Sequence, residues 1–197
     1  MHAGLISALW LAWLVYWLAA ARGAKSDQRR ESRASRAMHV IPLAVGFALL
    51  AVPRVFGSWL DGRFLPRTWA GYWAGVAMLA AGLAFATWAR QHLAGNWSAT
   101  VTLKRDHELI RSGPYRAVRH PIYTGVLLAV LGTAIAVGEW RGLIALAVIT
   151  AALWRKIGIE ERWLRELFQD QYARYCAEVP ALIPSVFRKS DAGLNPS

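Results

Sequence analysis

The sequence predicts an all-α polytopic membrane protein with five transmembrane helices and a cytoplasmic C-terminal amphipathic helix. Hydrophobic residues make up 56% of the 197 residues and charged residues only 18%, below the roughly 25% of a typical soluble domain. Five apolar runs divide the chain, and basic residues gather in every second connection between them. This composition excludes a disordered chain, and the single cysteine excludes a disulfide scaffold and a cysteine-based zinc module.

The first three apolar runs are long enough to cross a bilayer as helices. Residues 3–21 carry no charge, residues 40–60 carry a single arginine, and residues 68–89 are 22 uncharged positions. A helix of that last length is about 33 Å long at about 1.5 Å per residue, which matches the hydrocarbon core. Small residues recur along the third run, at Gly71, Gly75 and Gly82. Their spacing predicts close packing against another helix.

Two shorter runs, residues 122–138 and 142–154, are predicted to form a helical hairpin. Gly138-Glu139-Trp140-Arg141 between them is typical of a tight turn. Pro121 precedes the first of these helices, and proline favours the first helical position because its missing N–H needs no partner there.

The segment after the fifth run is predicted to form an amphipathic helix along the membrane surface. Apolar and aromatic side chains recur at helical spacing over residues 154–175. Lys156 and Glu160 lie one turn apart on one face of that helix. Glu161 and Arg165 have the same spacing and are interpreted as a solvated ion pair.

The lysines and arginines follow the positive-inside rule. Of these residues, 19 lie in the segments after the first, third and fifth runs, and 4 lie on the opposite side. This split predicts an inner-membrane protein with its N-terminus outside and its C-terminus in the cytoplasm. The net charge of +11 is then explained by topology and anionic lipids, so no nucleic-acid partner is expected. Arginines follow the first run and none precedes it, which predicts a retained span rather than a signal peptide. The oligomeric state is left open.

The polar segment 95–125 concentrates residues that bind small polar molecules. It is long and has little periodicity, and such segments in compact proteins are usually functional. It contains His107 and His120, and Tyr115 and Tyr123 flank the second of these. The backbone N–H groups at the helix start are expected to face the cytoplasm, ready for an anion or a polar ligand.

Four short motifs lie in order along this half of the chain. They are His107-x-Leu109-Ile110, Gly113-Pro114-Tyr115, Arg119-His120-Pro121-x-Tyr123-x-Gly125 and Glu160-Glu161-x-x-Leu164. Their order, spacing and topology resemble the isoprenylcysteine carboxyl methyltransferase family in an integral membrane, bacterial-type form, and the related phospholipid methyltransferases share part of the pattern. The resemblance covers residues 95–184, and the two N-terminal spans carry no signature.

The resemblance implies S-adenosyl-L-methionine as the methyl donor, held at the cytosolic face, with S-adenosyl-L-homocysteine as the product. When the family's donor-binding residues are carried over by position, the residues that would line the donor site are His107, Leu109, Ile110, Tyr115, His120, Pro121, Tyr123 and Glu160. Tyrosine rings suit the sulfonium cation, and a carboxylate suits the ammonium group of the donor.

The resemblance also implies Arg119, Lys156 and Glu160 as catalytic residues, with Lys156 and Arg155 binding the acceptor. The family usually has an arginine where this chain has Lys156. Arginine binds a carboxylate through two parallel hydrogen bonds, whereas lysine acts on it as a single point charge. This difference leaves the acceptor group open among a carboxylate, an amine and a thiol. The family and the position of the site at membrane depth imply that the acceptor is lipophilic. Residues 1–60 are expected to form two helices with a basic loop, and residues 61–197 the methyltransferase core, all as one domain.

Simpler interpretations stay open for the single residues. The alternative interpretation of Arg116 and Arg119 is that they only anchor the chain on the cytoplasmic side, as the positive-inside rule describes. The alternative for His107 is an ordinary histidine at the membrane interface. Lys156 and Glu160 have an alternative as a structural ion pair. The histidines lack the tight spacing of metal ligands, so no metal is expected.

Two alternatives concern the whole protein. Membrane sterol-type reductases that bind NADPH carry a related Arg-His-x-x-Tyr pattern, but an acidic residue commonly follows their glycine, whereas Val126 follows Gly125 here. A non-enzymatic membrane scaffold or carrier would not require His107, Tyr115, His120 and Glu160 to converge.

Overall fold

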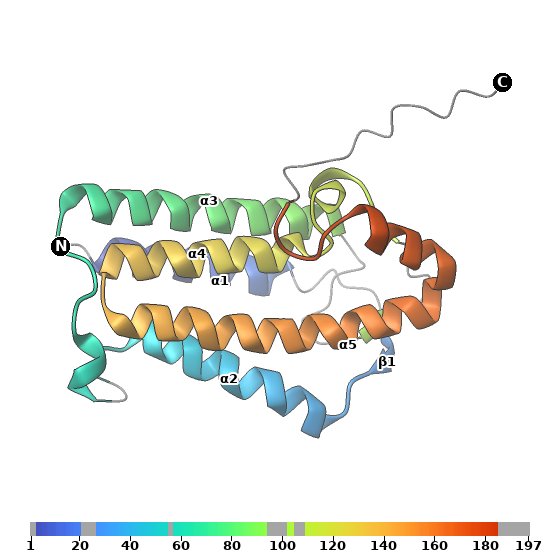
Figure 1. The fold of residues 1–197 in the computed structure, drawn as a ribbon, viewed down its shortest axis with the longest axis horizontal. Helices are drawn as coiled ribbons and strands as arrows, with labels where there is room; N and C mark the ends of the chain where they lie inside the picture. The colour runs from blue at the N-terminus through green and yellow to red at the C-terminus, as the bar shows by residue number, and fades with distance from the viewer. Residues whose placement is uncertain (1–2, 21–26, 55–56, 94–101, 105–108, 185–197) are drawn as a thin grey trace.

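The computed structural model describes residues 3–20, 27–54, 57–93, 102–104 and 109–184. Its helices run side by side along the long axis of the molecule (Figure 1). The α-helices are α1 (Ala3–Ala20), α2 (Arg33–Ala51), α3 (Trp69–Leu93), α4 (Pro121–Val137) and α5 (Trp140–Glu178). Two 3-10 turns and two strands complete the described elements: η2 (Ser58–Asp61), η4 (Gly113–Arg116), β1 (Asp27–Arg30) and β2 (Thr102–Lys104).

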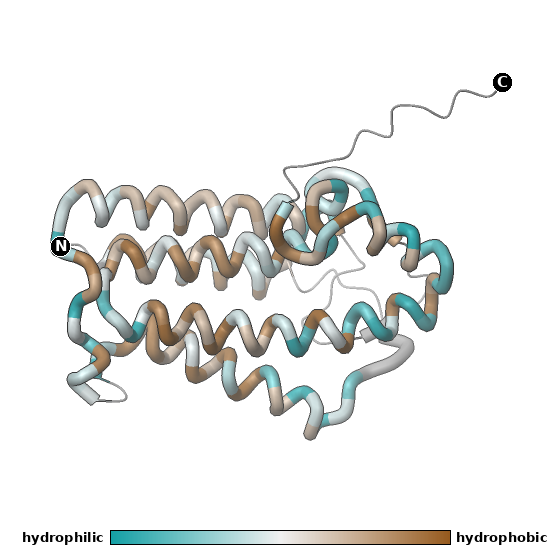
Figure 2. Tube along the Cα trace, viewed as in Figure 1, coloured by the Kyte–Doolittle hydropathy of each residue, from teal (hydrophilic) through white to brown (hydrophobic). Residues whose placement is uncertain are grey.

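The helical class predicted from the sequence is confirmed. Helices α2, α3 and α5 are long and apolar enough to cross a membrane, whereas α1 and α4 are apolar but shorter. Hydrophobic residues lie along the helices of the bundle, and hydrophilic residues gather toward the C-terminal end of α5 (Figure 2). The polar end of α5 therefore lies beside the start of α4, where the sequence motifs meet.

A short antiparallel ribbon was not predicted. Strands β1 and β2 pair so that Asp27 lies opposite Lys104 and Arg30 lies opposite Thr102. Strands of four and three residues carry no usable periodicity. The ribbon joins the connection after α1 to the connection after α3 at the end of the bundle where α4 begins (Figure 1).

Helices α3 and α4 pack backbone to backbone through glycines. A Cβ atom built on Gly75 would lie 2.5 Å from the carbonyl oxygen of Gly132, and one built on Gly82 would lie 2.5 Å from that of Gly125. Such contacts leave no room for any side chain. The predicted packing role is thus confirmed for Gly75 and Gly82, whereas Gly71 lies beside Thr68, whose hydroxyl accepts its N–H at 3.0 Å.

We expect alanine to have opposite effects at two helical glycines. Gly82→Ala should lower the unfolding free energy by about 1–3 kcal/mol, because the added methyl overpacks the α3–α4 contact. Gly158→Ala in α5 should raise it by up to about 1 kcal/mol, because a Cβ atom there meets nothing within 4 Å and alanine is the better helix former. Equilibrium unfolding in mixed micelles measures both. Equal effects at the two sites would contradict this account of the packing.

Helices α2 and α5 pair on the other side of α4. Arg141, buried in the first turn of α5, donates from Nη1 to the carbonyls of Leu49 and Leu50 at 2.8 and 2.9 Å. These carbonyls belong to the last turn of α2, where no following backbone N–H of the helix is available to bind them. A cation is favourable there because it also interacts with the helix dipole. Glu139 accepts from Nε of Arg141 at 2.6 Å, so the charge is balanced.

The hairpin between α4 and α5 is confirmed, together with the helix start at Pro121. Gly138 ends α4 with a φ of 71°, in the left-handed region that favours glycine. Helix α5 then continues for 39 residues and is interrupted at Gln169, where φ is 44° and ψ is −120°. The chain beyond this kink turns back over the start of α4 (Figure 1).

Helix α1 packs on α3 and α4 through apolar side chains and two polar contacts. The indole of Trp10 donates to the hydroxyl of Thr133 at 3.1 Å. Arg90, buried near the end of α3, donates to the carbonyl of Ala20 at 2.8 Å, which satisfies the last turn of α1. A core cluster that includes Val130 and Ile149 joins α4 to α5 between these contacts.

Candidate functional site

A buried carboxylate on α5 holds the start of α4. Glu161 accepts from Nη2 and Nε of Arg119 at 2.7 and 3.0 Å, and its Oε1 lies 3.1 Å from Nε2 of His120. It also accepts from Arg165 at 3.2 Å, which confirms that pair. However, the Glu161 side chain is only 10% exposed, so its interpretation as part of a solvated pair is wrong. The hydrogen bonds that Glu161 accepts from the guanidinium groups of Arg119 and Arg165 are charge-assisted, which makes them stronger than neutral ones.

Arg119 links three parts of the chain. Beyond Glu161, its Nη1 donates to the carbonyl of Cys176 at 3.3 Å and to that of Val179. Burial by itself would lower the pKa of the guanidinium, and the hydrogen bonds and charge of Glu161 raise it above its ordinary value. Arg119 is therefore a fixed cation between the start of α4, α5 and the segment that follows α5.

The segment after α5 covers the start of α4. The backbone N–H of Arg119 donates to Pro180 at 2.9 Å, and that of His120 donates to Ala181 at 3.0 Å. The hydroxyl of Thr124 donates to the carbonyl of Leu182 at 2.7 Å. The expectation of free N–H groups at this helix start is therefore wrong for Arg119 and His120, because the chain itself supplies their acceptors.

A second group of polar side chains meets on the other face of His120. The hydroxyl of Tyr123 donates to Oε1 of Glu160 at 2.6 Å, and the rings of Tyr123 and His120 stack with centroids 5.6 Å apart. Nδ1 of His120 lies 3.7 Å from Oε2 of Glu160. Nζ of Lys156 lies 3.9 Å from Oε1 of Glu160 and 5.3 Å from the Tyr123 ring centroid. Four of the residues expected in the site thus converge where α4 meets α5.

Of the other expected donor-site residues, the structure describes Tyr115, Pro121, Leu109 and Ile110. Tyr115 is buried in η4, donates to the carbonyl of Ala89 at 3.4 Å and accepts at its own carbonyl from Tyr175 at 2.6 Å. Burial raises the pKa of the Tyr115 phenol well above its usual range, so it stays neutral. Pro121 is fully buried. Leu109 packs against the cluster that contains Tyr175, Ile110 is half-buried, and His107 lies outside the described residues.

Arg155 points away from Lys156, toward α2. Its Nη2 donates to the hydroxyl of Ser35 at 3.2 Å, and its Nη1 lies 3.9 Å from Oε1 of Glu31. Glu31 also lies 3.7 Å from Nε2 of the buried His39. Sequence analysis missed Glu31, Ser35 and His39, because no local pattern shows which helix packs beside α5.

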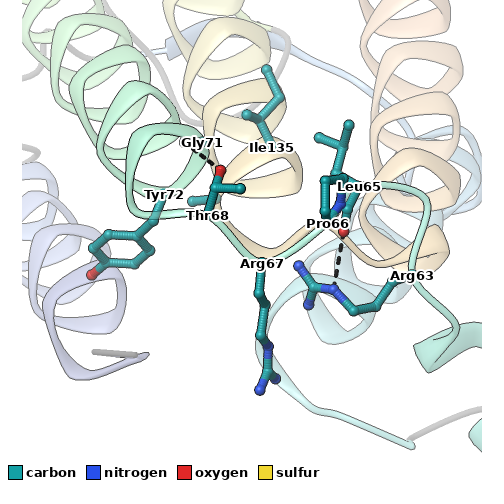
Figure 3. A pocket seen from close by; sticks show the side chains of 9 residues that line it. Arg63, Leu65, Pro66, Arg67, Thr68, Gly71, Tyr72 and Ile135 are labelled. Atoms are coloured by element: carbon teal, nitrogen blue, oxygen red, sulfur yellow. Dashed lines mark hydrogen bonds between the residues drawn. The ribbon is translucent and has the colours of Figure 1, made fainter.

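A separate small cavity of about 120 Å³ lies at the opposite end of the bundle, between the start of α3 and the end of α4 (Figure 3). Arg63 beside it donates to the carbonyls of Leu65 and Val137 at 3.0 and 2.9 Å. None of the residues expected in the site lines this cavity. It is therefore a feature of the connection between α2 and α3.

Comparison with known proteins finds one matching family model and several similar proteins. The sequence model of the phospholipid methyltransferase family matches residues 70–171. Protein-S-isoprenylcysteine O-methyltransferase B of Arabidopsis thaliana is 36% identical over 84 residues, which are 41% of this chain and 41% of that protein. Cobalt-zinc-cadmium resistance protein CzcN of Cupriavidus metallidurans is 30% identical over 71% of this chain and 63% of its own length.

Two further matches are shorter or rest on the fold. Methanethiol S-methyltransferase 1 of Bradyrhizobium diazoefficiens is 39% identical over 70 residues, 36% of this chain and 24% of that protein. The solved structure of a eukaryotic intramembrane Ras methyltransferase, isoprenylcysteine carboxyl methyltransferase, superposes with a TM-score of 0.50 and 24% identity. That match covers 78% of this chain and 50% of the solved chain. This chain thus spans about two fifths of the Arabidopsis relative and half of the solved chain.

Proposed function

The chain belongs to the phospholipid methyltransferase family, and from this premise we propose that it is an integral membrane methyltransferase that uses S-adenosyl-L-methionine. The observation that carries the proposal is the convergence of His120, Tyr123, Lys156 and Glu160 at the junction of α4 and α5. An aromatic face beside a carboxylate suits a ligand with two positive groups, a sulfonium and an ammonium.

The residues of this junction divide into those that touch the donor and those that position them. Glu160 binds the ammonium group, Tyr123 presents its ring to the sulfonium, and His120 donates to the carboxylate or the ribose. When bound, the donor supplies a methyl group on a positively charged sulfur, which a nucleophile displaces in line. Arg119 acts through Glu161, which holds the ring of His120, and is therefore a positioning residue. Alignment of this kind supplies a large share of the rate in displacement reactions.

The apolar wall of the donor site is proposed to come from the segment before η4. Leu109 and Ile110 are both half-buried there, and Tyr115 and Pro121, which follow in the chain, are buried. His107 belongs to the same motif and is proposed to line the donor site as well.

Lys156 is proposed to orient the acceptor. Its ammonium group lies over Tyr123, next to Glu160, so it faces the same junction from the side of α5. The relatives carry names that describe transfer to an oxygen and to the sulfur of a thiol. We propose a lipophilic acceptor that enters laterally between helices at membrane depth.

The proposed topology has five spans, with α1 and α4 as short ones. The 19-to-4 split of basic residues supports a cytoplasmic location for the junction of α4 and α5 and for the C-terminus. The part of α5 beyond Trp154 is proposed to lie at the cytoplasmic surface, where its charged side chains reach water.

We expect the purified protein to bind the methyl donor and not a nicotinamide cofactor. Isothermal titration in detergent should give micromolar-range binding of S-adenosyl-L-methionine and of S-adenosyl-L-homocysteine, because the junction supplies a carboxylate and an aromatic face. NADPH should give no heat. Tight binding of NADPH together with no response to the methyl donor would instead support a reductase, and no binding of either would support a scaffold or carrier.

A further inference from the structure

The small cavity at the end of the bundle opposite the proposed donor site has walls of two kinds. It measures about 120 Å³ and lies between the start of α3 and the end of α4 (Figure 3). Leu65, Pro66 and Ile135 give it apolar surface, whereas Arg63 and Arg67 bring two cations to it. Such a combination suits a ligand in which an anionic group is joined to a nonpolar part.

Arg63 is held in place at this cavity. Its Nε and Nη1 donate to the carbonyls of Leu65 and Val137 at 3.0 and 2.9 Å. Its charge is only distantly balanced, because Nη1 lies 4.0 Å from Oε1 of Glu139, beyond hydrogen-bond length. The side chain is 30% exposed. Arg63 is therefore a fixed cation that a ligand can still reach.

The two carboxylates at this end, Asp61 and Glu139, are engaged by other arginines. Nε of Arg141 lies 2.6 Å from Oε2 of Glu139 and 3.5 Å from Oδ1 of Asp61. Nε of Arg54 lies 3.9 Å from Oδ2 of Asp61. Arg67 is exposed, and within the described part of the chain it has neither a hydrogen bond nor an ion pair. Its guanidinium is thus available to an anion from outside the chain.

The charge at this end of the bundle is positive. Residues 52–68 and 138–141 contain four arginines and two carboxylates, which leaves an excess of two positive charges. Arg67 directly precedes Thr68 and the start of α3, where the helix dipole adds to the positive potential. This potential attracts an anionic ligand and repels the ammonium group of a zwitterionic one.

Exposed tryptophans indicate the level of the cavity relative to a membrane. Trp69 and Trp73 lie in the first two turns of α3, Trp140 begins α5, and all three are exposed. Tryptophan is enriched at membrane–water interfaces because its ring is apolar and its N–H is polar. The cavity at the start of α3 therefore lies at the level of the lipid headgroups, where the commonest anionic group is a phosphate.

We propose that this cavity binds the phosphate of an anionic phospholipid, with Arg67 as its main contact and Arg63 beside it. A guanidinium binds phosphate through two parallel hydrogen bonds. The apolar wall then packs against the glycerol and the first methylene groups of the lipid. By the proposed topology this lipid belongs to the outer leaflet. The site is separate from the junction of α4 and α5, and the inference does not depend on the proposed enzymatic activity.

The acyl chains of this lipid lie on the outer surface of α3 and not between α3 and α4. The two helices touch further along, where a Cβ atom built on Gly75 would lie 2.5 Å from the carbonyl oxygen of Gly132. No acyl chain passes through that contact. Trp73, Ala77 and Ala80 form an exposed face of α3 that the chains can follow. Recognition is therefore expected to depend on the headgroup rather than on the acyl chains.

The test uses the delipidated full chain in nonionic detergent and native mass spectrometry to measure the affinity of the first bound lipid. The wild type should bind dioleoyl phosphatidylglycerol more tightly than dioleoyl phosphatidylcholine, which has the same chains but carries a cation. Arg67→Gln should weaken phosphatidylglycerol binding by about 10-fold or more, the effect of losing a hydrogen bond to a charged group. Arg67→Lys should give a smaller loss, because lysine keeps the charge without the paired hydrogen bonds.

Two control variants remove an exposed arginine elsewhere. Arg54→Gln changes the same end of the bundle at a residue that does not line the cavity, and Arg116→Gln changes the opposite end. Both should bind phosphatidylglycerol as the wild type does. The melting temperature of Arg67→Gln without lipid should equal that of the wild type. Added phosphatidylglycerol should raise the melting temperature of the wild type more than that of Arg67→Gln, because a ligand of the folded state stabilises it.

Sodium phosphate and glycerol 1-phosphate distinguish a lipid from a free anion. At the same phosphate concentration as the lipid they should leave the melting temperature unchanged, and a rise as large as that with phosphatidylglycerol would overturn the lipid assignment. Equal phosphatidylglycerol affinity in the wild type and Arg67→Gln would overturn the site, as would an equal loss in either control. Equal affinity for the two lipids would overturn the recognition of charge. None of these results involves methyl transfer, so the proposed function is tested separately.

Discussion

Replacing Glu161 by alanine should lower the unfolding free energy by about 3–5 kcal/mol, the cost of removing one partner of a buried ion pair. Arg119 and His120 would keep their buried positions, with side chains 11% and 7% exposed, and would lose the carboxylate that now binds both. Unfolding in mixed micelles, followed by tryptophan fluorescence, measures the change.

The matched control is Glu178→Ala on the same helix. Glu178 also pairs with an arginine, Arg111, but its side chain is 58% exposed. Exposed ion pairs contribute about 0.2–1 kcal/mol, so the control should stay below about 1 kcal/mol. If both variants lose the same stability, Glu161 does not hold the start of α4 as described.

Glu160→Gln should weaken binding of S-adenosyl-L-methionine by about 10- to 150-fold, which corresponds to about 1.5–3 kcal/mol for a hydrogen bond to a charged group. The amide keeps the shape of the side chain and removes the charge that is proposed to bind the donor ammonium. Lys156→Met should leave donor affinity nearly unchanged and lower turnover, because Lys156 is proposed to orient the acceptor. Titration calorimetry and labelled methyl transfer measure the two effects.

The competing interpretation of this pair is purely structural. Nζ of Lys156 and Oε1 of Glu160 are 3.9 Å apart and one helical turn apart, so each single change could act by breaking an ion pair. In that case both variants would lose stability alike, and the double variant would recover part of the loss. Glu166→Gln, an exposed position of α5, serves as the control. Equal losses of donor affinity in the two single variants would overturn the division of roles.

Local signals account for the parts of the fold that the sequence predicts well. Pro121 and Gly138 mark the ends of α4 because each meets a backbone requirement that few other residues satisfy. Gly75 and Gly82 indicate a close helix contact for the same reason. These features depend on a few neighbouring residues, so no knowledge of the remaining chain is needed.

The parts that sequence analysis missed depend on how separate helices are placed. Glu160 and Glu161 are adjacent, but a helix turns about 100° per residue, so one faces Tyr123 and the other faces Arg119. The sequence alone does not set the rotation of α5 relative to α4. The direction of Arg155 toward Ser35 depends likewise on the pairing of α2 with α5, across 120 residues of sequence.

The distance along the chain between the two halves of the junction has a consequence for biosynthesis. Arg119 and His120 are made first, Glu161 follows about 40 residues later, and the carbonyl of Val179 lies 60 residues beyond Arg119. At about 5–20 residues per second, a ribosome needs about 3–12 s to make those 60 residues. During that interval α4 has neither its carboxylate clamp nor its covering segment. The nascent chain therefore completes this junction only after Val179 has been made, later than all the helices that precede α5.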